Sequence, residues 1–532
     1  MPGSLEEAAP GVWMVHAPLS EVDADRLRSA RPGLVVLGNA RVLFNEGEPF
    51  VRAVRQLRDV AGGGTVLWAP RVALPHRLAL LAYLGVDIVD TVEMALRSRS
   101  GEFLDPTLGL VDEAPARAEQ WCPCPVCRRQ PPGPLEDHGE TVLGEELARV
   151  RGAIRAGRLR ELVEARLGAE PLLAELLRYA DRDLATLLDE RTPVTADATR
   201  VYVLRESQRR PEVARFRSRF LERYRPPPSK RVLLLVPCSR TKPYRNSRSH
   251  RRFSGALEGL AHLERVHTVS VTSPLGLVPR ELEDTYPARH YDIPVTGEWD
   301  EMERVAVVDA LRAILKSGPY TTTLFHLDPE EYRFIADAGF AGRWTLSDGR
   351  TTTNEALGSL RRAANDSLEG LRGVEGGPLA TVREELAAVA TFQFGAPAAE
   401  RLFAPPIRLA GRPWFQRITD GHGTDLATWR EPRGLFQLTV AGAARMLPAH
   451  PLEVEVDPKV NLLGDLFTPG VVRADPLIRS GDAVLLVREG MLLGVGEAAL
   501  PGPLMTQLAR GTAVWVRHRV HAPPVAAAPT HT

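Results

Sequence analysis

The pattern of hydrophobic and polar residues in the first 110 positions predicts alternating strands and helices. Short apolar runs of strand length are separated by amphipathic stretches with apolar residues at helical spacing, which is typical of an α/β fold. Residues 144–167 continue this helical spacing as one long helix. The predicted strands are LVVLGN (34–39), TVLWAP (65–70) and VDIVDTVEM (86–94), and the intervening helices are VRAVRQLRD (51–59) and HRLALLAYLG (76–85).

A second α/β unit follows the segment RPPPSK, which is a linker because three consecutive prolines cannot continue a helix. We predict a central α/β domain at 228–375, a small α+β domain at 379–447, a domain of short strands at 449–522 and a disordered tail at 523–532. Buried strands are expected at VLLLVPC (232–238), HTVSVTSPLG (267–276) and TTTLFHLD (321–328), and a helix at EMERVAVVDALRAIL (301–315).

Composition limits the class of protein. A chain of 532 residues is too long for one domain. Lys plus Arg and Asp plus Glu each total 67, so a nucleic acid must be held by local patches, not by a global field. No apolar run approaches the roughly 18 residues of a membrane helix, and the acidic start MPGSLEEAAPG lacks the features of a secretion signal. We therefore expect a cytoplasmic protein.

Three of the four cysteines lie in the segment WCPCPVC, and a histidine follows. Cys122, Cys124, Cys127 and His138 supply three thiolates and one imidazole, a closed tetrahedral set that suits a structural zinc ion. Clustering of this kind argues against a disulfide framework. The alternatives are three buried cysteines or a redox sensor.

The same segment resembles the tRNA-guanine transglycosylase family, through GVDIVDTVEMALRSRSGEFL before the cysteines and HGETVLGEELARVRGAIRAGRLRELVE after them. The resemblance implies that Asp90 corresponds to the family's nucleophile. The chain lacks the upstream D-S-G-G-F-Q block, however, and residues 1–110 are too few for a whole barrel. We therefore expect residues 1–195 to form a degenerate, partly TIM-barrel-like module in which Asp90 is structural.

The loop VPCSRTKPYRNSRSH follows a predicted buried strand, which places the Cys238 thiol at the carboxyl edge of a sheet, where open α/β sheets bind ligands. Lys242 and His250, if they fold back, would favour the thiolate by their charge. Ser247 and Tyr244 can donate hydrogen bonds to a developing anion. The alternative is that Cys238 is a small core residue.

A second polar cluster, SPLGLVPRELEDTYPARHYDIPVTGEW, is expected over the same sheet edge. Its candidates for substrate binding or acid–base work are Glu281, His290, Tyr291 and Asp292. An acidic residue there would suit a cationic amine. The alternative is a surface loop without a catalytic role.

The C-terminal segments TPGVVRADPLIRSGD, GVGEA and GTAVWVRHR resemble a PUA domain, a small β-barrel that binds structured RNA. The preceding segment, from ATFQFGAPAAERLF to GLFQLTVAGAARML, resembles the domain that precedes PUA in archaeal transglycosylases. Basic side chains in the PUA-like segment are candidates for phosphate contacts, and the alternative is a solvated face. These candidates are Arg473, Arg479, Arg517, His518 and Arg519.

The motif P-C-x3-K-P-Y-x2-S-x2-H, from Pro237 to His250, is similar to the signature of archaeosine synthases. This resemblance implies an enzyme that acts on 7-cyano-7-deazaguanine at position 15 of tRNA and converts its nitrile toward an amidine. The implied partners are tRNA, free lysine as the amine donor and a radical-SAM enzyme, and a homodimer is a further option. The competing functions are a transglycosylase that inserts the base, a non-catalytic tRNA-binding protein and a base-handling enzyme on DNA.

Our mechanistic hypothesis is that Cys238 adds to the nitrile to form a thioimidate, which an amine then converts to an amidine. His250 would shuttle protons, and Lys242 would lower the thiol pKa or hold a phosphate. Tyr244 and Ser247 would position the base, and Asp292 completes the predicted catalytic set. The alternative is direct attack of the amine on the nitrile, with a structural Cys238.

Overall fold

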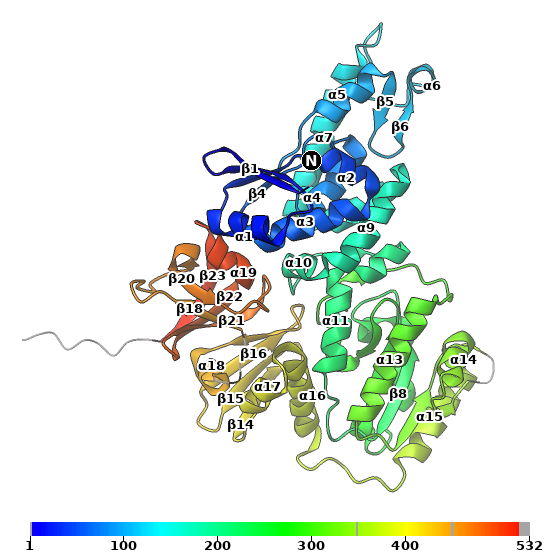
Figure 1. Ribbon diagram of the computed structural model, residues 1–532. Helices are drawn as coiled ribbons and strands as arrows, with labels where there is room; N and C mark the ends of the chain where they lie inside the picture. The colour runs from blue at the N-terminus through cyan, green and yellow to red at the C-terminus, as the bar shows by residue number, and fades with distance from the viewer. Residues whose placement is uncertain (1–2, 347–348, 448, 450–451, 521–532) are drawn as a thin grey trace, which may run out of the picture. The chain divides into compact units, whose positions relative to one another are not determined.

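The computed structural model describes residues 3–346, 349–447, 449 and 452–520. It divides into two compact units, one formed by Met1–Asp189 with Leu204–Pro211 and the other by Glu190–Val203 with Glu212–Thr532. Figure 1 shows the first unit in blue to cyan and the start of the second in green. The predicted tail at 523–532 lies outside the described residues.

The first unit contains a four-stranded sheet of order β1-β2-β3-β4. β2, β3 and β4 are parallel, as the alternating pattern predicted, and β1 is antiparallel to β2. The order runs from one edge strand, β1, to the other, β4, so this sheet of the first unit is open and does not form a barrel. Its strands are β1 (Ser4–Ala9), β2 (Val12–His16), β3 (Leu34–Leu37) and β4 (Val66–Trp68).

The predicted strand at 86–94 is wrong. Ile88 forms only an isolated parallel bridge with Trp68, and the helix α5 (Val92–Arg99) begins shortly afterwards. The predicted helix at 144–167 is two helices, α7 (Leu135–Arg155) and α8 (Leu159–Arg166), divided at Gly157, which has a positive φ of 63°. Apolar runs at these positions therefore do not distinguish a strand from a buried helix segment.

The helices of the first unit bury one apolar side each. In α3 the buried residues Phe50, Val54 and Leu57 recur every three or four positions, which is the helical spacing that predicted it. The remaining elements are α1 (Glu21–Ala30), α2 (Ala40–Glu46), α3 (Glu48–Ala61), α4 (Leu78–Leu84), β5 (Glu102–Asp105), β6 (Gly109–Asp112), α6 (Glu113–Ala118), α9 (Pro171–Asp183) and α10 (Ala185–Glu190).

The central domain is built on a five-stranded sheet of order β10-β9-β8-β12-β13. β8, β9, β12 and β13 are parallel, whereas β10 returns antiparallel to β9. The three buried strands predicted here are confirmed. The bounds are β8 (Val232–Pro237), β9 (Val266–Thr272), β10 (Gly276–Pro279), β12 (Thr322–Phe325) and β13 (Arg343–Trp344).

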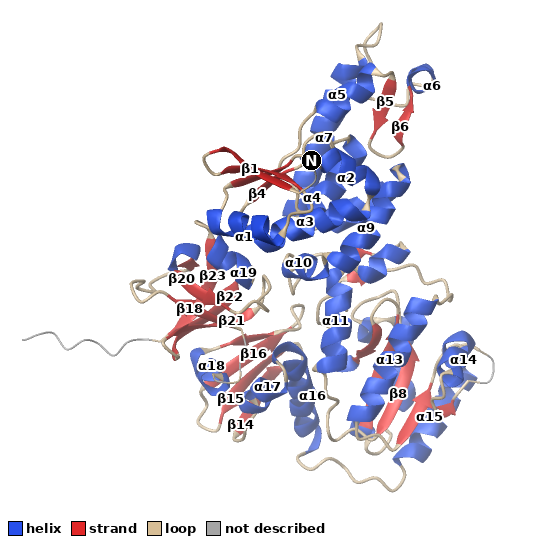
Figure 2. Ribbon diagram, in the orientation of Figure 1, coloured by secondary structure: helices blue, strands red, loops and turns tan. Residues whose placement is uncertain are grey.

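Both faces of this sheet are covered, which explains why β8 reads as an unbroken apolar run. Val232, Leu234 and Val236 face a core shared with α12 and α15. Leu233 and Leu235 face the opposite core, shared with α11, α13 and α14. Figure 2 shows α11, α13, α14 and α15 around β8. The helix bounds are α11 (Pro211–Glu222), α12 (Arg248–Leu257), α13 (Glu301–Ser317), α14 (Pro329–Asp337) and α15 (Asn354–Leu368).

Two β-rich domains complete the second unit. The first has a meander of order β14-β15-β16-β17 with three helices, and the second a six-stranded sheet of order β19-β23-β22-β21-β18-β20. Their elements are α16 (Gly377–Phe394), α17 (Ala396–Leu402), β14 (Ile407–Arg412), β15 (Phe415–Asp420), β16 (Asp425–Arg430), β17 (Phe436–Leu438), α18 (Val440–Met446), β18 (Glu453–Val456), β19 (Leu466–Phe467), β20 (Val471–Ala474), β21 (Ala483–Arg488), β22 (Met491–Ala498), α19 (Gly502–Gln507) and β23 (Thr512–Arg519).

None of the helices in the described part of the chain combines the length and apolar character needed to cross a membrane.

α18 packs closely on β16, so we predict that one added methyl group at this contact strongly lowers the stability of the protein. A Cβ at Gly442 would overlap the carbonyl oxygen of Leu426, so we expect Gly442→Ala to destabilise the protein by about 1–3 kcal/mol. Gly255 in α12 has open space where a Cβ would lie, so Gly255→Ala should be neutral or stabilise by about 0.5–1 kcal/mol. Urea unfolding of both variants measures the difference, and equal stability of the two would contradict this packing.

Candidate active site and metal centre

Cys238 directly follows β8 and extends the backbone hydrogen bonding between β8 and β9 by one residue. Its backbone N–H donates to the carbonyl oxygen of Val271 at 3.0 Å, so the thiol lies at the carboxyl edge of the parallel sheet. The side chain is half-buried against the core on the α13 side. This position agrees with the one predicted from the sequence.

Hydroxyl groups and an ammonium group surround this sulfur. The Thr272 hydroxyl, at the end of β9, lies 3.1 Å from the Tyr244 hydroxyl and 2.6 Å from that of Tyr291, and its interaction with the thiol lowers the Cys238 pKa. The Lys242 ammonium lies 4.1 Å from the centre of the Tyr291 ring, and burial lowers the Lys242 pKa. Of the predicted loop residues, Lys242 and Tyr244 therefore do converge on Cys238.

Ser247 and His250 have different positions from those predicted. Ser247 is the N-cap of α12, where its hydroxyl accepts a hydrogen bond from the His250 N–H at 3.2 Å. The His250 ring is buried, with Nε2 3.0 Å from the Pro237 carbonyl oxygen and Nδ1 3.4 Å from the Arg280 guanidinium. Burial, followed by the charge of Arg280, lowers the His250 pKa to about 3. The ring is therefore neutral and supplies no positive charge.

The thiol is protonated at neutral pH. Burial, followed by the neighbouring carboxyl of Glu331, raises the pKa of Cys238 to about 11, against the opposite effects of Thr272 and Lys242. The expectation that Lys242 and His250 together hold a thiolate is wrong for the protein without substrate. The charge of Lys242 lowers the Cys238 pKa, as expected, but desolvation of the thiol raises this pKa by more.

Besides Thr272, Glu331 is a residue of this site that the sequence analysis missed. It lies in the first turn of α14, where Oε2 accepts a hydrogen bond from the N–H of the N-cap residue Asp328 at 3.3 Å. Burial, followed by the charge of Asp328, raises its pKa to about 8. The sequence Asp-Pro-Glu-Glu after a strand is a capping-box signature and would have located the helix start, but not the proximity to Cys238.

The residues of the second predicted polar cluster lie in different parts of the central domain. Tyr291 and Asp292 form β11, which pairs with β7 (Arg200–Val201), and the Asp292 carboxylate is close enough to raise the pKa of Lys242. Glu281 instead accepts a hydrogen bond from Tyr224 at 2.6 Å and lies 3.3 Å from His267, at the amino end of β9. The expectation that Glu281 shares the edge with Cys238 is therefore wrong.

His290 also has no contact with the sulfur. Burial, followed by the charge of Arg289, lowers its pKa to about 4, and its carbonyl oxygen accepts the hydrogen bond from Arg200 that extends the β7–β11 pair. We assign it to the framework of the loop.

Arg245 fixes the loop that carries the motif. Its backbone N–H donates to Glu283 at 2.9 Å and its guanidinium pairs with Asp284 at 2.9 Å and with Glu431. Glu283 and Asp284 are both buried. The loop from 238 to 250 is therefore held by buried charges and by the α12 N-cap.

The metal-ligand candidates do converge, in the first unit. One ligand atom from each of Cys122, Cys124, Cys127 and His138 lies within 4.8 Å of the others. Nδ1 of His138 is 3.5 Å from the Cys124 sulfur and 3.4 Å from the Cys127 sulfur. Ligands about 2.0–2.3 Å from a tetrahedral ion are separated by about 3.5 Å, so these residues fit a metal ion.

Contacts outside this cluster orient the imidazole. Nε2 of His138 lies 3.0 Å from the carbonyl oxygen of Leu104 in β5, and the ring stacks on Phe103 at 4.0 Å. The Nε2–H donates to that carbonyl, which leaves the Nδ1 lone pair for a metal. Burial raises the Cys127 pKa to about 12 and also raises that of Cys122, so three thiolates gather here only if a cation compensates them.

Comparison with known proteins agrees with this arrangement. Residues 384–452 match the patch-forming domain C2 of tRNA-guanine transglycosylase, residues 460–520 the PUA domain, and residues 213–364 a domain of unknown function, DUF5591. The chain is 34% identical to archaeosine synthase of Haloferax volcanii, over 93% of this chain and 84% of the relative. The chain belongs to the archaeosine synthase family.

Two further relatives extend this relationship. The archaeosine synthase subunit alpha of Methanosarcina acetivorans is 34% identical, over 91% of this chain and 79% of the relative. A tRNA-guanine(15) transglycosylase of Methanobrevibacter smithii is 26% identical, over 83% of this chain and 65% of the relative. This chain is thus also similar in sequence to a transglycosylase.

In this member of the archaeosine synthase family, Asp90 has a local structural role. Its carboxylate accepts hydrogen bonds from the backbone N–H groups of Arg71 at 3.2 Å and Val92 at 3.0 Å. Both oxygens are thus used to hold the turn that leads into α5. This agrees with the structural role expected for Asp90.

The four arginines predicted to bind RNA differ in exposure. Arg473 and Arg517 are exposed and pair with Glu455 and Glu497, each at 3.2 Å. Arg519, also exposed, donates to the carbonyl oxygen of Leu462 at 3.2 Å.

Arg479 is buried and donates to the carbonyl oxygen of Pro476 at 2.7 Å. Arg479 is therefore the least accessible of the four arginines, and its RNA contact stays a prediction.

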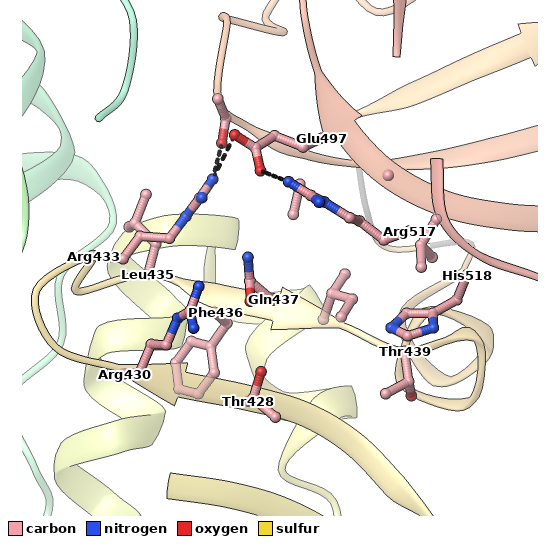
Figure 3. Close-up of a pocket in the computed structure, with 15 residues that line it drawn as sticks. Thr428, Arg430, Arg433, Leu435, Phe436, Gln437, Thr439, Glu497, Arg517 and His518 are labelled. Carbon is pink, nitrogen blue, oxygen red and sulfur yellow. Dashed lines mark hydrogen bonds and ion pairs between the residues drawn. The ribbon is translucent and has the colours of Figure 1, made fainter. Parts of the chain in front are cut away.

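A polar cavity of about 250 Å³ lies between the C2 and PUA strands. Figure 3 shows Arg433 and Arg517 both directed at Glu497, at 2.9 and 3.2 Å, so the carboxylate offsets these two cations. Arg430 and His518 also line the cavity.

The metal cluster generates a prediction about its buried thiol. We expect Cys124→Ser to lose most of the bound metal and to unfold at lower temperature, because binding at structural zinc sites contributes roughly 10–16 kcal/mol. Cys238→Ser, in the other unit, is the matched control and should keep full metal content. Elemental analysis and calorimetry measure both effects, and unchanged metal content in Cys124→Ser would contradict the ligand assignment.

Proposed function

We propose that this protein modifies tRNA by adding an amine to the nitrile of 7-cyano-7-deazaguanine at position 15, giving an amidine. The observation that carries the proposal is the position of Cys238 at the sheet edge, in a chain related to archaeosine synthases over 93% of its length. We further propose free lysine as the amine, a radical-SAM enzyme as partner and zinc as the metal at Cys122, Cys124, Cys127 and His138.

The reaction would proceed through a covalent intermediate. Addition of the Cys238 thiol across the nitrile gives a thioimidate, and an amine then displaces the thiol and leaves the amidine. A thiol suits this role because sulfur both adds to an electrophilic carbon and leaves from it, which divides one difficult step into two.

Burial of the sulfur sets a condition on this step. A pKa of about 11 lies roughly four units above neutral pH, so forming a free thiolate costs about 5 kcal/mol. Proton removal must therefore accompany formation of the carbon–sulfur bond. A preformed thiolate is not the resting state.

The neighbouring groups would bind and orient the reactants. The Lys242 ammonium and the Asp292 carboxylate carry opposite charges, so they suit the carboxylate and the ammonium of an amino acid, respectively. Tyr244 and Tyr291, with buried hydroxyls joined through Thr272, would hold the sulfur in place.

His250 would act as a positioning residue instead of the proton shuttle predicted from the sequence. Its contact with the Pro237 carbonyl and its stacking on Tyr244 at 5.6 Å brace the residue before Cys238 from both sides. Ser247 would contribute by capping the helix that carries this ring.

Binding of tRNA is proposed for the PUA and C2 domains. Exposed Arg473, Arg517 and Arg519 are suited to phosphate contacts once they exchange their present partners for RNA.

Base insertion is the second candidate function, because a tRNA-guanine(15) transglycosylase is also related to this chain. The engaged carboxylate of Asp90 and the open four-stranded sheet make it the weaker proposal.

The central test replaces the sulfur. We expect Cys238→Ala and Cys238→Ser to lose at least about 10³-fold in the rate of amine addition, because neither forms a thioimidate. The assay incubates each protein with tRNA containing 7-cyano-7-deazaguanine and labelled lysine, followed by nuclease digestion and mass spectrometry.

Ser254→Ala, an exposed change on α12, is the matched control and should keep wild-type activity. Full activity of both Cys238 variants would exclude the covalent route. Insertion of free base in place of amine addition by the wild type would favour the transglycosylase function.

A further inference from the structure

Glu331 and Cys238 lie in segments that follow two neighbouring parallel strands, β12 and β8 respectively. β8 and β12 pair in register, with Leu235 opposite Phe325, and the His326 N–H donates to the Leu235 carbonyl at 2.9 Å. Asp328, the N-cap of α14, and Cys238 each lie three residues beyond this last pair, so α14 begins at the same edge of the sheet as the thiol. Glu331 lies in the first turn of α14 and so projects from the same edge.

Glu331 is a buried carboxyl group without a cation. Its side chain is 6% exposed, and among the residues that the structure describes no Lys, Arg or His forms an ion pair with it. Oε2 accepts the bond from Asp328, whereas Oε1 has no hydrogen bond to any described residue. Buried Glu283, by contrast, pairs with Arg280 at 2.8 Å. A largely buried carboxyl group without a cation favours its neutral form, which can both donate and accept a proton.

We propose that Glu331 transfers protons between the Cys238 sulfur and the nitrile nitrogen of the bound base. The inference rests on the proposed function and adds to it the group that moves the protons. A neutral carboxylic acid suits this role because one oxygen donates a proton while the other accepts one.

In the first half-reaction the carbon–sulfur bond forms as the nitrile becomes an imine. The Glu331 hydroxyl gives its proton to the nitrile nitrogen, and its other oxygen takes the proton from the thiol. The products are the thioimidate and a carboxylic acid again, so no external acid, base or oxidant is needed.

In the second half-reaction the neutral amine adds to the thioimidate carbon and the carbon–sulfur bond breaks. One oxygen of Glu331 takes a proton from the amine, and the other returns a proton to the departing sulfur. The amidine and the free thiol result, so the same group serves both steps.

The competing role of Glu331 is structural, as the third residue of a capping box. The helix α13 offers a matched case, since Glu303 accepts a hydrogen bond from the Asp300 N–H at 2.7 Å in the same arrangement. Glutamine keeps that acceptor oxygen but transfers no proton. Glu331→Gln therefore preserves the capping role and removes the proposed chemical one.

The first experiment uses the wild-type protein and follows thioimidate formation by intact-protein mass spectrometry, with cyano-deazaguanine tRNA and no amine. The mechanism needs the protonated form of Glu331, so the rate should fall as pH rises through about 8. The groups whose charges reach Glu331 are Asp328, Glu330 and Cys238. A simple thiolate mechanism predicts the opposite, a rate that rises toward pH 11.

The second experiment compares Glu331→Gln with Glu303→Gln in the same assay. We expect Glu331→Gln to lose about 10²-fold or more in thioimidate formation and Glu303→Gln to keep the wild-type rate. Alkylation of Cys238 by iodoacetamide, which needs no proton donor, should be as fast or faster in Glu331→Gln, because the neighbouring carboxyl raises the thiol pKa. A structural defect would not produce these two opposite changes.

Equal thioimidate formation by Glu331→Gln and wild type, or a wild-type rate that rises through pH 8, would overturn the role of Glu331. Loss of both alkylation and thioimidate formation would also overturn it, in favour of the structural role. Failure of the wild type to form any thioimidate would instead overturn the proposed function.

Discussion

The parallel pairing of β8 with β9 and β12 is the constraint on which the site depends. It carries three chain segments to one edge of the sheet, where Cys238, Thr272 and the start of α14 at Asp328 follow strands β8, β9 and β12. The continuous apolar sequence of β8 makes this pairing possible, because its side chains fill cores on both faces. The position of the reactive groups at the sheet edge thus depends on the burial of the apolar side chains along β8.

The same burial decides the state of the reactive groups. Desolvation keeps the thiol of Cys238 protonated, the imidazole of His250 neutral and the carboxyl of Glu331 largely protonated near neutral pH. A site of neutral groups suits addition to a nitrile, which needs a nucleophile and a proton at once. The positive charge of Lys242 is itself reduced by burial, so no single ion dominates the site.

The sequence alone predicts the local features of this arrangement. VLLLVP identified β8 and the position of Cys238, and the spacing of the cysteines identified the metal cluster completed by His138. Contacts over long sequence separations were not predictable: Thr272 and Glu331 lie 34 and 93 residues beyond Cys238. The contact of the His250 ring with a backbone carbonyl was not predictable either, because motif spacing does not reveal the direction in which the α12 N-cap turns the ring. In the first unit, VDIVDTVEM was mistaken for a strand because its apolar start forms only one isolated bridge, at Ile88, and its end belongs to α5.

The central claim is that the Cys238 sulfur bonds to the nitrile carbon of the base. The most direct test is carbon-13 NMR of the protein bound to tRNA whose cyano-deazaguanine is labelled at that carbon, without amine. The account predicts that the nitrile resonance is replaced by a thioimidate resonance, which is absent in Cys238→Ala and converts to an amidine resonance when lysine is added. A nitrile resonance that persists until lysine arrives, and then converts directly to the amidine in both proteins, would contradict it.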